Sequence, residues 1–147
     1  MQYAQSPDIK IFISCHKDCH VPANPLFFPI QVGTALSGCK IPNMLHDDDG
    51  DNISEKNKSY CELTAQYWAW KNADADYYGF FHYRRYFSFA EKVFPANAFG
   101  EVFASANSDA VLKTYAVTAE RMREIIPKYD LIIPAEGGFE ERGLTLY

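Results

Sequence analysis

The stretch YYGFFHYRRYF, residues 77–87, changes from an aromatic, apolar run to a basic one within a few positions. A turn-like segment, NADAD, precedes it, and residues 77–81 have the composition typical of a buried strand. His82, Arg84 and Arg85 follow at once. Ligands of open α/β sheets bind at the carboxyl ends of strands. The stretch therefore predicts a strand over residues 76–82 and a site where that strand ends.

Other segments extend this pattern in both directions. IKIFISC, residues 9–15, and YDLIIP, residues 129–134, also predict strands. A helix is expected near residues 59–72, with Ser59 and Glu62 as a capping box. Thr118 is a plausible N-cap for a second helix over residues 119–126. The three prolines within residues 16–29 favour a loop, and residues 30–38 fit a short helix or a strand-like segment.

Aromatic residues are dense, at 16% of the chain, and several fall on the expected helix. Leu63, Tyr67 and Trp70 are spaced i, i+4 and i+7, which places them on one helical face. Trp68 lies off this stripe and is expected to pack against a different element. We expect Tyr67, Trp68 and Trp70 to belong to the core rather than to a sugar-stacking platform.

The order strand, helix, strand, helix, strand predicts an α/β domain with a mostly parallel sheet flanked by helices. The 147 residues suffice for a single domain over residues 1–147, with a flexible N-terminus at residues 1–8. Three strands make a thin sheet, and no closing helix follows GLTLY. We therefore expect the sheet to be incomplete at the C-terminus.

Composition excludes several classes of protein. A net charge of −5 argues against a nucleic-acid binder, and 48% apolar residues argue against disorder. The chain shows no signal peptide and no apolar run long enough to cross a bilayer, so a cytoplasmic location is expected. The four cysteines are then free thiols. The spacing of CHKDCH is too compressed for a zinc finger, so we expect no structural zinc at Cys15, His16, Cys19 and His20.

Three polar clusters follow the three expected strands: His16 and Lys17; His82, Arg84 and Arg85; and Glu136, Gly137 and Gly138. The planar fork of arginine matches phosphate oxygens. Neighbours on a strand point to opposite faces, so Arg84 and Arg85 can share a pocket only if the strand has already ended. In the alternative, structural interpretation, an arginine pairs with Asp48 or Asp51.

The acidic segment HDDDGDNISEKN, residues 46–57, is a second candidate site. It fails as an EF-hand, because Leu45 and Lys56 would occupy the first and twelfth ligand positions. No metal site is our first expectation, and the alternative is a divalent site at Asp47, Asp49 and Asp51. The sequence has no Walker loop and no glycine-rich dinucleotide motif.

Four blocks carry a resemblance: PIQVGTALSG, HDDDGDNISEKN, YCELTAQYWAWKN and DADYYGFFHYRRYF. In this order they resemble the N-terminal part of a bacterial domain-of-unknown-function family, over residues 9–134. The family occurs in capsule and exopolysaccharide gene clusters, and its members are described as glycosyltransferases, some as galactofuranosyltransferases. The resemblance implies the N-terminal portion of a Rossmann-like, glycosyltransferase-A-like domain that acts on nucleotide sugars.

The resemblance also implies partners and a place of action. The expected donor is a nucleotide sugar, with a UDP-sugar favoured, and the need for a divalent metal is left open. The acceptor is a glycan or lipid-linked glycan of a capsule, exopolysaccharide or lipopolysaccharide. The expected location is cytoplasmic, at the inner face of the membrane, with peripheral association allowed.

Many such folds hold the donor diphosphate through a metal on an Asp-x-Asp motif, but here the comparable strand end carries cations. Fixed cations neutralise a diphosphate without metal. The donor-binding candidates are His16, Lys17, Asp51, Asn52, His82, Arg84 and Arg85, and the catalytic candidates are Asp48, Asp51 and His82.

Two other classes stay open at this point. One is a noncatalytic nucleotide- or carbohydrate-binding domain, or an inactive fragment. The other is a metal-dependent hydrolase that uses the acidic segment with nearby histidines.

Overall fold

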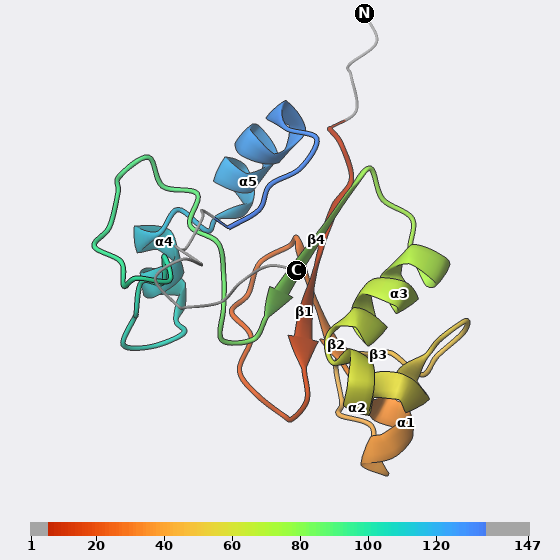
Figure 1. The fold of residues 1–147 in the computed structure, drawn as a ribbon. Helices are drawn as coiled ribbons and strands as arrows, with labels where there is room; N and C mark the ends of the chain where they lie inside the picture. The colour runs from red at the N-terminus through yellow and green to blue at the C-terminus, as the bar shows by residue number, and fades with distance from the viewer. Residues whose placement is uncertain (1–5, 135–147) are drawn as a thin grey trace, which may run out of the picture. The chain divides into compact units, whose positions relative to one another are not determined.

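A computed structural model describes residues 6–134, and the first of two units in the chain, Met1–Tyr86, is built around a four-stranded sheet (Figure 1). Its strands are β1 (Ile9–Cys15), β2 (Phe27–Gln31), β3 (Leu45–His46) and β4 (Tyr77–His82). They lie in the order β3-β2-β1-β4, and each neighbouring pair is parallel. This confirms the expected parallel α/β fold and two of the three expected strands, at β1 and β4.

Strand β1 lies at the centre of the sheet because it pairs with β2 on one edge and β4 on the other. Ile11, Phe12 and Ile13 are at most 1% exposed, so successive residues on both faces of the strand are buried. Continuous apolar strands of this kind are typical of parallel sheets covered on both faces.

Strand β2 corrects the expectation of a loop over residues 16–29, since Phe27–Gln31 pairs with β1. Proline is tolerated here for a geometric reason. The Val32 amide donates to Cys15 O, so by alternation the nitrogen of Pro29 points away from β1. On that side β3 pairs with Ile30 and Gln31 and not with Pro29, so this pairing requires no N–H at Pro29. The strand is followed by the short helix α1 (Thr34–Ser37).

The helical region over residues 54–72 is broken rather than continuous. It consists of a 3₁₀ turn (Ser54–Lys56), α2 (Asn57–Tyr60) and α3 (Leu63–Asn72). Cys61 interrupts it with a φ of 48°, a left-handed conformation that no helix contains. Glu62 becomes the N-cap residue of α3 and makes no side-chain cap. The expected capping box at Ser59 and Glu62 was therefore wrong.

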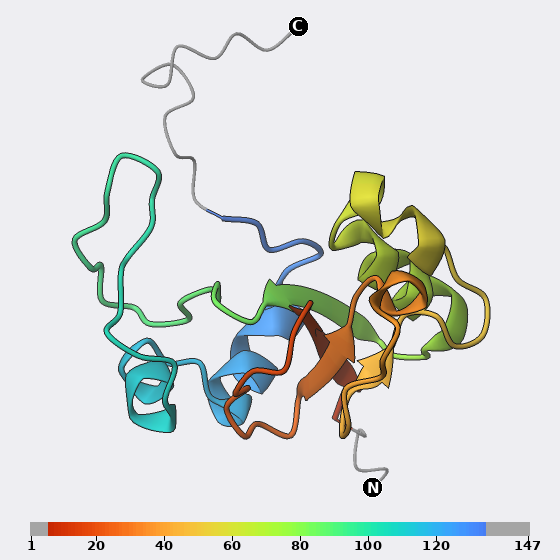
Figure 2. The same ribbon diagram turned by 90° about the horizontal axis from the view of Figure 1, so that it is seen from below.

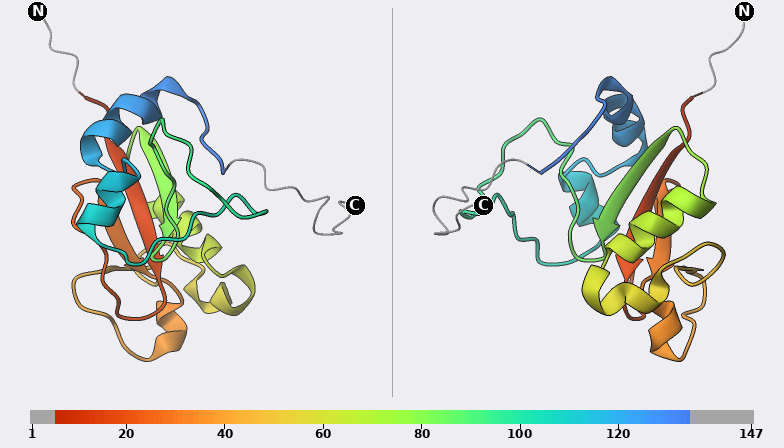
Figure 3. Two further views of the ribbon diagram at one scale, coloured as in Figure 1. Left: turned by 90° about the vertical axis from the view of Figure 1, so that its left-hand side faces the viewer. Right: turned by 45° about the vertical axis from the view of Figure 1, so that its right-hand side comes forward.

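Helix α3 lies against one face of the sheet (Figure 3), but with the face opposite to the one expected. Thr64, Ala65, Trp68 and Ala69 are buried. Leu63 is 51% exposed and Trp70 69% exposed, so the Leu63–Tyr67–Trp70 stripe does not face the core. The small Ala65 and Ala69 let the helix approach the sheet closely, and Trp68 fills the remaining space with its ring edge-on to Phe12, 6.1 Å between centroids.

The second unit, Phe87–Tyr147, holds α4 (Asp109–Thr114), α5 (Ala119–Ile125) and a 3₁₀ turn (Ile126–Lys128). Thr118 caps α5 by accepting a hydrogen bond from the Arg121 amide, as expected. Residues 129–134 form no strand, which corrects the third strand prediction. An apolar run becomes a strand only where a neighbouring strand pairs with its backbone, and none of the described strands does so here.

Some expectations lie outside the described residues. They include residues 1–5 of the expected flexible N-terminus and the cluster Glu136, Gly137 and Gly138. The expectation of a single domain stays a prediction. Within residues 6–134 no helix combines the length and apolar character needed to cross a membrane.

Candidate functional site

The carboxyl ends of all four strands meet at one edge of the sheet, which Figure 2 views from below. From β1 the chain proceeds to β2 and β3 on one side, while β4 lies on the other side of β1. The gap between the ends of β1 and β4 is thus a topological switch point. Sheets of this kind bind ligands at such a point.

A tight turn ends β4 at the switch point. His82 pairs with Ser14 of β1, and the Arg85 amide then donates a 2.9 Å hydrogen bond to His82 O. This bond closes a turn over residues 82–85. Because the strand has ended, strand alternation no longer separates the two arginines, and both are exposed.

Tyr83 is the centre of the cluster that the turn creates. Tyr83 is only 6% exposed. The centroids of the His16 and Tyr83 rings lie 5.3 Å apart. Lys17 Nζ lies 5.9 Å from the Tyr83 centroid and Arg84 Cζ lies 5.1 Å from it. One buried ring thus gathers cations from the ends of two strands, at distances where cations interact with aromatic faces.

The cations of this cluster, Lys17, Arg84 and Arg85, form no ion pair with an acidic residue of the described range 6–134. Asp48 and Asp51, the partners that a structural network would need, make their contacts elsewhere. Unpaired positive charge beside a buried ring is suited to an anionic ligand.

His82 is held in a defined state by its surroundings. Burial lowers its pKa, and the nearby charges of Arg84, Arg85 and His16 lower it further, while Glu62 opposes them. The Arg84 amide donates to His82 Nδ1 at 3.2 Å. This hydrogen bond assigns the proton of the neutral ring to Nε2. His82 is therefore a hydrogen-bond donor through Nε2.

Asp47 has a structural role within the acidic segment. It is completely buried and accepts hydrogen bonds from the amides of Gly33 and Thr34, at 2.8 and 3.0 Å. Ser54 Oγ donates a further one at 2.5 Å. Both carboxylate oxygens are thus used within the chain, and Asp47 joins the end of β2 to the start of the 3₁₀ turn.

The other residues of the acidic segment are also engaged. Lys40 contacts Asp48 at 3.0 Å and Asp49 at 2.6 Å, and Tyr67 OH donates to Asp51 at 3.1 Å. Asn52 holds the turn by donating to the carbonyls of Asp48 and Gly50. Among the described residues no group of three His, Cys, Asp or Glu side chains could hold a metal ion.

The acidic segment does not join the cation cluster. It follows β3, and the strand order places β2 and β1 between β3 and β4. Three strand spacings separate the two ends, about 14 Å. The structure therefore brings His16, Lys17, His82 and Arg84 together. Asp51 lies instead against helix α3, where its amide donates to Asn72 Oδ1 and its carboxylate accepts from Tyr67, and Asn52 follows it in the same turn.

The segment CHKDCH begins at Cys15, the last residue of β1. Burial raises the pKa of the Cys15 thiol, and a hydrogen bond with Cys19 raises it further. A thiol that keeps its proton is a poor metal ligand. His16 next to it contacts Tyr83 and His82 through its ring.

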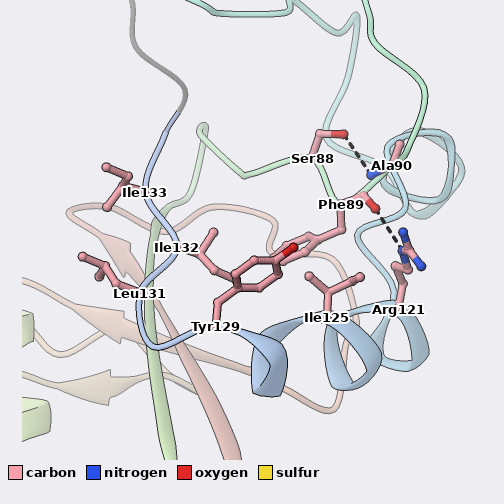
Figure 4. A pocket seen from close by; sticks show the side chains of 9 residues that line it. All are labelled: Ser88, Phe89, Ala90, Arg121, Ile125, Tyr129, Leu131, Ile132 and Ile133. Atoms are coloured by element: carbon pink, nitrogen blue, oxygen red, sulfur yellow. Dashed lines mark hydrogen bonds between the residues drawn. The ribbon is translucent and has the colours of Figure 1, made fainter.

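A cavity of about 440 Å³ lies in the second unit (Figure 4). Its lining is mainly apolar, from Phe89, Ile125, Tyr129 and residues 131–133. Arg121 also lines it, but its guanidinium is held by Glu91, Glu124 and Phe89 O. The cavity therefore offers no free charge to an anionic ligand, and we do not regard it as the reactive site.

The sequence prediction missed two residues of the cluster, Tyr83 and Glu62. Tyr83 stood inside the basic stretch, but nothing in the pattern distinguished it from the other aromatic residues. Glu62 was assigned to a helix cap. Its carboxylate instead approaches His82, with Oε1 4.0 Å from Nε2.

Comparisons with known proteins agree with this description. The family Domain of unknown function (DUF4422) matches residues 10–144. The apo structure of the WbbM bifunctional glycosyltransferase is similar to this chain, with 40% identity and a TM-score of 0.75. The match covers 80% of this chain and 21% of that one. No curated protein matches the chain. The expected family resemblance is confirmed.

Proposed function

The chain belongs to the Domain of unknown function (DUF4422) family, and from this membership we propose that it is part of a glycosyltransferase. The similarity to a bifunctional glycosyltransferase supports the reaction class. The proposed donor is a nucleotide sugar, with a UDP-sugar favoured. The proposed reaction is hexosyl transfer, galactofuranosyl transfer included.

One observation carries the proposal at the level of the site. Lys17 and Arg84 converge on the buried Tyr83 at the switch point, without acidic partners among the described residues. A nucleotide diphosphate supplies the negative charge that these cations lack. Arginine binds two phosphate oxygens at once through its fork, and lysine adds a point charge.

The same cations have a chemical task in the transfer. When the bond between the sugar and the diphosphate breaks, negative charge grows on the leaving oxygen. Lys17 and Arg84 would stabilise that charge from fixed positions and so lower the barrier of the step. Lys17 and Arg84 carry their own positive charge, so this role requires no metal.

The acceptor follows from the family resemblance rather than from the site. We propose a growing glycan or lipid-linked glycan of a capsule, exopolysaccharide or lipopolysaccharide. The work would then take place in the cytoplasm, at the inner face of the membrane, by peripheral association.

The direct test of donor binding is a thermal-shift screen of the full-length protein against nucleoside diphosphates and nucleotide sugars. A ligand that binds only the folded state raises the melting temperature by mass action. We expect UDP and at least one UDP-sugar to raise it. A flat response to every nucleotide, with and without Mg²⁺, would contradict the proposal.

Arg84→Lys gives a sharper test, with Arg85→Lys as its matched control. The Arg84 guanidinium lies beside the Tyr83 ring, with Cζ 5.1 Å from the ring centroid. The lysine keeps the charge but loses the fork, so the Kd for UDP should rise about tenfold, or about 1.4 kcal/mol. Arg85→Lys should leave the Kd within about twofold, and both variants should melt like wild type. Calorimetric titration with UDP measures this. Equal affinities in all three proteins would argue against a phosphate role for Arg84.

Turnover separates the transferase from a noncatalytic binding domain. Both bind UDP-sugar, but only the transferase releases UDP from it in the presence of a glycan acceptor.

A further inference from the structure

We propose that Glu62 is the general base of the transfer, and that His82 positions the acceptor hydroxyl against it. This proposal rests on the transferase function proposed above. It adds a carboxylate to the cluster of His16, Lys17, His82, Tyr83 and Arg84.

The position of Glu62 follows from the break before α3. Because Cys61 turns the chain, Glu62 becomes the N-cap residue of α3. Its side chain makes no cap and reaches the end of β4, where Oε1 lies 4.0 Å from His82 Nε2. Its side chain is 51% exposed, against 15% for His82. The carboxylate is thus accessible to an incoming acceptor, while the imidazole is fixed.

The 4.0 Å separation is too long for a direct hydrogen bond and suits one intervening oxygen. If an oxygen lay about 2.8 Å from each atom, the Nε2···O···Oε1 angle at that oxygen would be about 90°. A hydroxyl placed there would accept the proton on His82 Nε2 and donate its own proton to Glu62. This is the arrangement that a base needs before it removes a proton.

The charge state of His82 fits this division of roles. Its pKa is lowered, first by burial and then by Arg84, Arg85 and His16, and Glu62 acts in the opposite direction. Nδ1 is occupied by the Arg84 amide, so the neutral ring meets the hydroxyl only through Nε2–H. A ring that presents a donor cannot take the proton itself, and the task passes to the carboxylate.

Other carboxylates of the first unit are less suited. Asp47 is buried and saturated by its three donors. Asp48 and Asp49 contact Lys40, and Asp51 accepts from Tyr67. All four follow β3, which β2 and β1 separate from β4.

The step balances as a direct displacement. The acceptor oxygen forms a bond to the anomeric carbon as the bond from that carbon to the phosphate oxygen breaks. The hydroxyl proton passes to Glu62, which later releases it to solvent. The nucleoside diphosphate leaves with the electron pair, its charge held by Lys17 and Arg84.

The test uses the full-length protein, a UDP-sugar that wild type turns over, and Glu62→Gln, which keeps the shape and removes the base. We expect kcat to fall at least 100-fold, as is typical for loss of a general base. The Kd for UDP should stay within about twofold. Glu55→Gln is the matched control, since Glu55 is an exposed glutamate on the preceding turn, and it should keep wild-type kcat.

Two further comparisons distinguish a chemical role from a structural one. Formate should restore part of the turnover of Glu62→Ala, because a small carboxylate can occupy the vacated space. His82→Gln should retain more kcat than His82→Ala, because its amide can donate from near the position of Nε2. If Glu62 and His82 had only structural roles, formate would not restore turnover and the two His82 variants would have equal kcat.

The outcomes separate the two proposals. An active wild type whose Glu62→Gln variant keeps kcat within about threefold overturns the role of Glu62 and leaves the transferase standing. A wild type that neither binds UDP nor transfers sugar overturns both, since there is then no acceptor hydroxyl to deprotonate.

Discussion

Asp47 joins two segments of the chain through one buried carboxylate. Its donors are the amides of Gly33 and Thr34, which follow β2, and the hydroxyl of Ser54, which starts the 3₁₀ turn. Hydrogen bonds to a buried charged group stabilise more than neutral ones do, and a missing partner leaves a desolvated donor. Asp47 therefore fixes the carboxyl edge around β2 and β3.

Asp47→Asn should lower the stability of the protein. The amide nitrogen of asparagine would face a backbone amide, so one acceptor is replaced by a second donor, at a cost of about 2–3 kcal/mol. This corresponds to a fall in Tm of roughly 5–10 °C. Differential scanning calorimetry measures it. Asp49→Asn, at an exposed residue paired with Lys40, is the control and should change Tm little. Equal Tm changes in the two variants would remove the structural role of Asp47.

Helix α3 carries tryptophans on two faces, one of which is buried and the other exposed. Trp68 is buried and donates its indole N–H to Asp49 O at 2.8 Å. Trp70 is exposed, and Lys71 Nζ covers its ring at 3.7 Å from the centroid. The face of α3 that carries the alanines packs against the sheet, because small side chains allow close packing.

Trp68→Ala and Trp70→Ala should separate these two faces. Truncating the buried ring leaves a cavity and an unpaired carbonyl, at about 3–5 kcal/mol. Truncating the exposed ring removes its contacts with Lys71 and with the Tyr67 ring, at a cost of about 1–2 kcal/mol. Urea denaturation of both variants measures the difference. If Trp70→Ala cost more than Trp68→Ala, the orientation of α3 described above would be wrong.

At the scale of the whole molecule, the second unit begins with a long irregular segment. Residues 87–108 contain no helix or strand, and most of residues 91–106 are exposed. Phe99 and Phe103 lie within it at 45% and 81% exposure. Exposed segments outside helices and strands are preferred sites of proteolysis.

Brief treatment with dilute chymotrypsin should therefore cut after Phe99 or Phe103 before it cuts inside the strands of the sheet. Mass spectrometry of the early fragments identifies the cut site. Phe103→Ser should move the first cut to Phe99. Early cleavage inside β1 or β4, at Phe12 or Phe80, would be the contrary result, because those bonds are protected by the sheet.

The amino-acid sequence by itself determined the local elements with strong patterns. IKIFISC and YYGFFH are dense in branched and aromatic residues, which favour strands, and both formed them. Thr118 capped its helix because a threonine cap acts within three residues. The basic residues after β4 were expected at the carboxyl edge, since the position of a residue after a strand is a local property.

Only the tertiary structure decided which segments meet. The period of α3 allowed either face to be buried, and the sheet selected the one with alanines. Pro29 entered a strand because β3 is too short to need its missing N–H. YDLIIP has the composition of a strand but found no neighbour among the described residues. The meeting of Glu62 with His82 depended on the turn at Cys61 and on the pairing of β4 with β1. Such contacts depend on the three-dimensional path of the chain, which no local pattern contains.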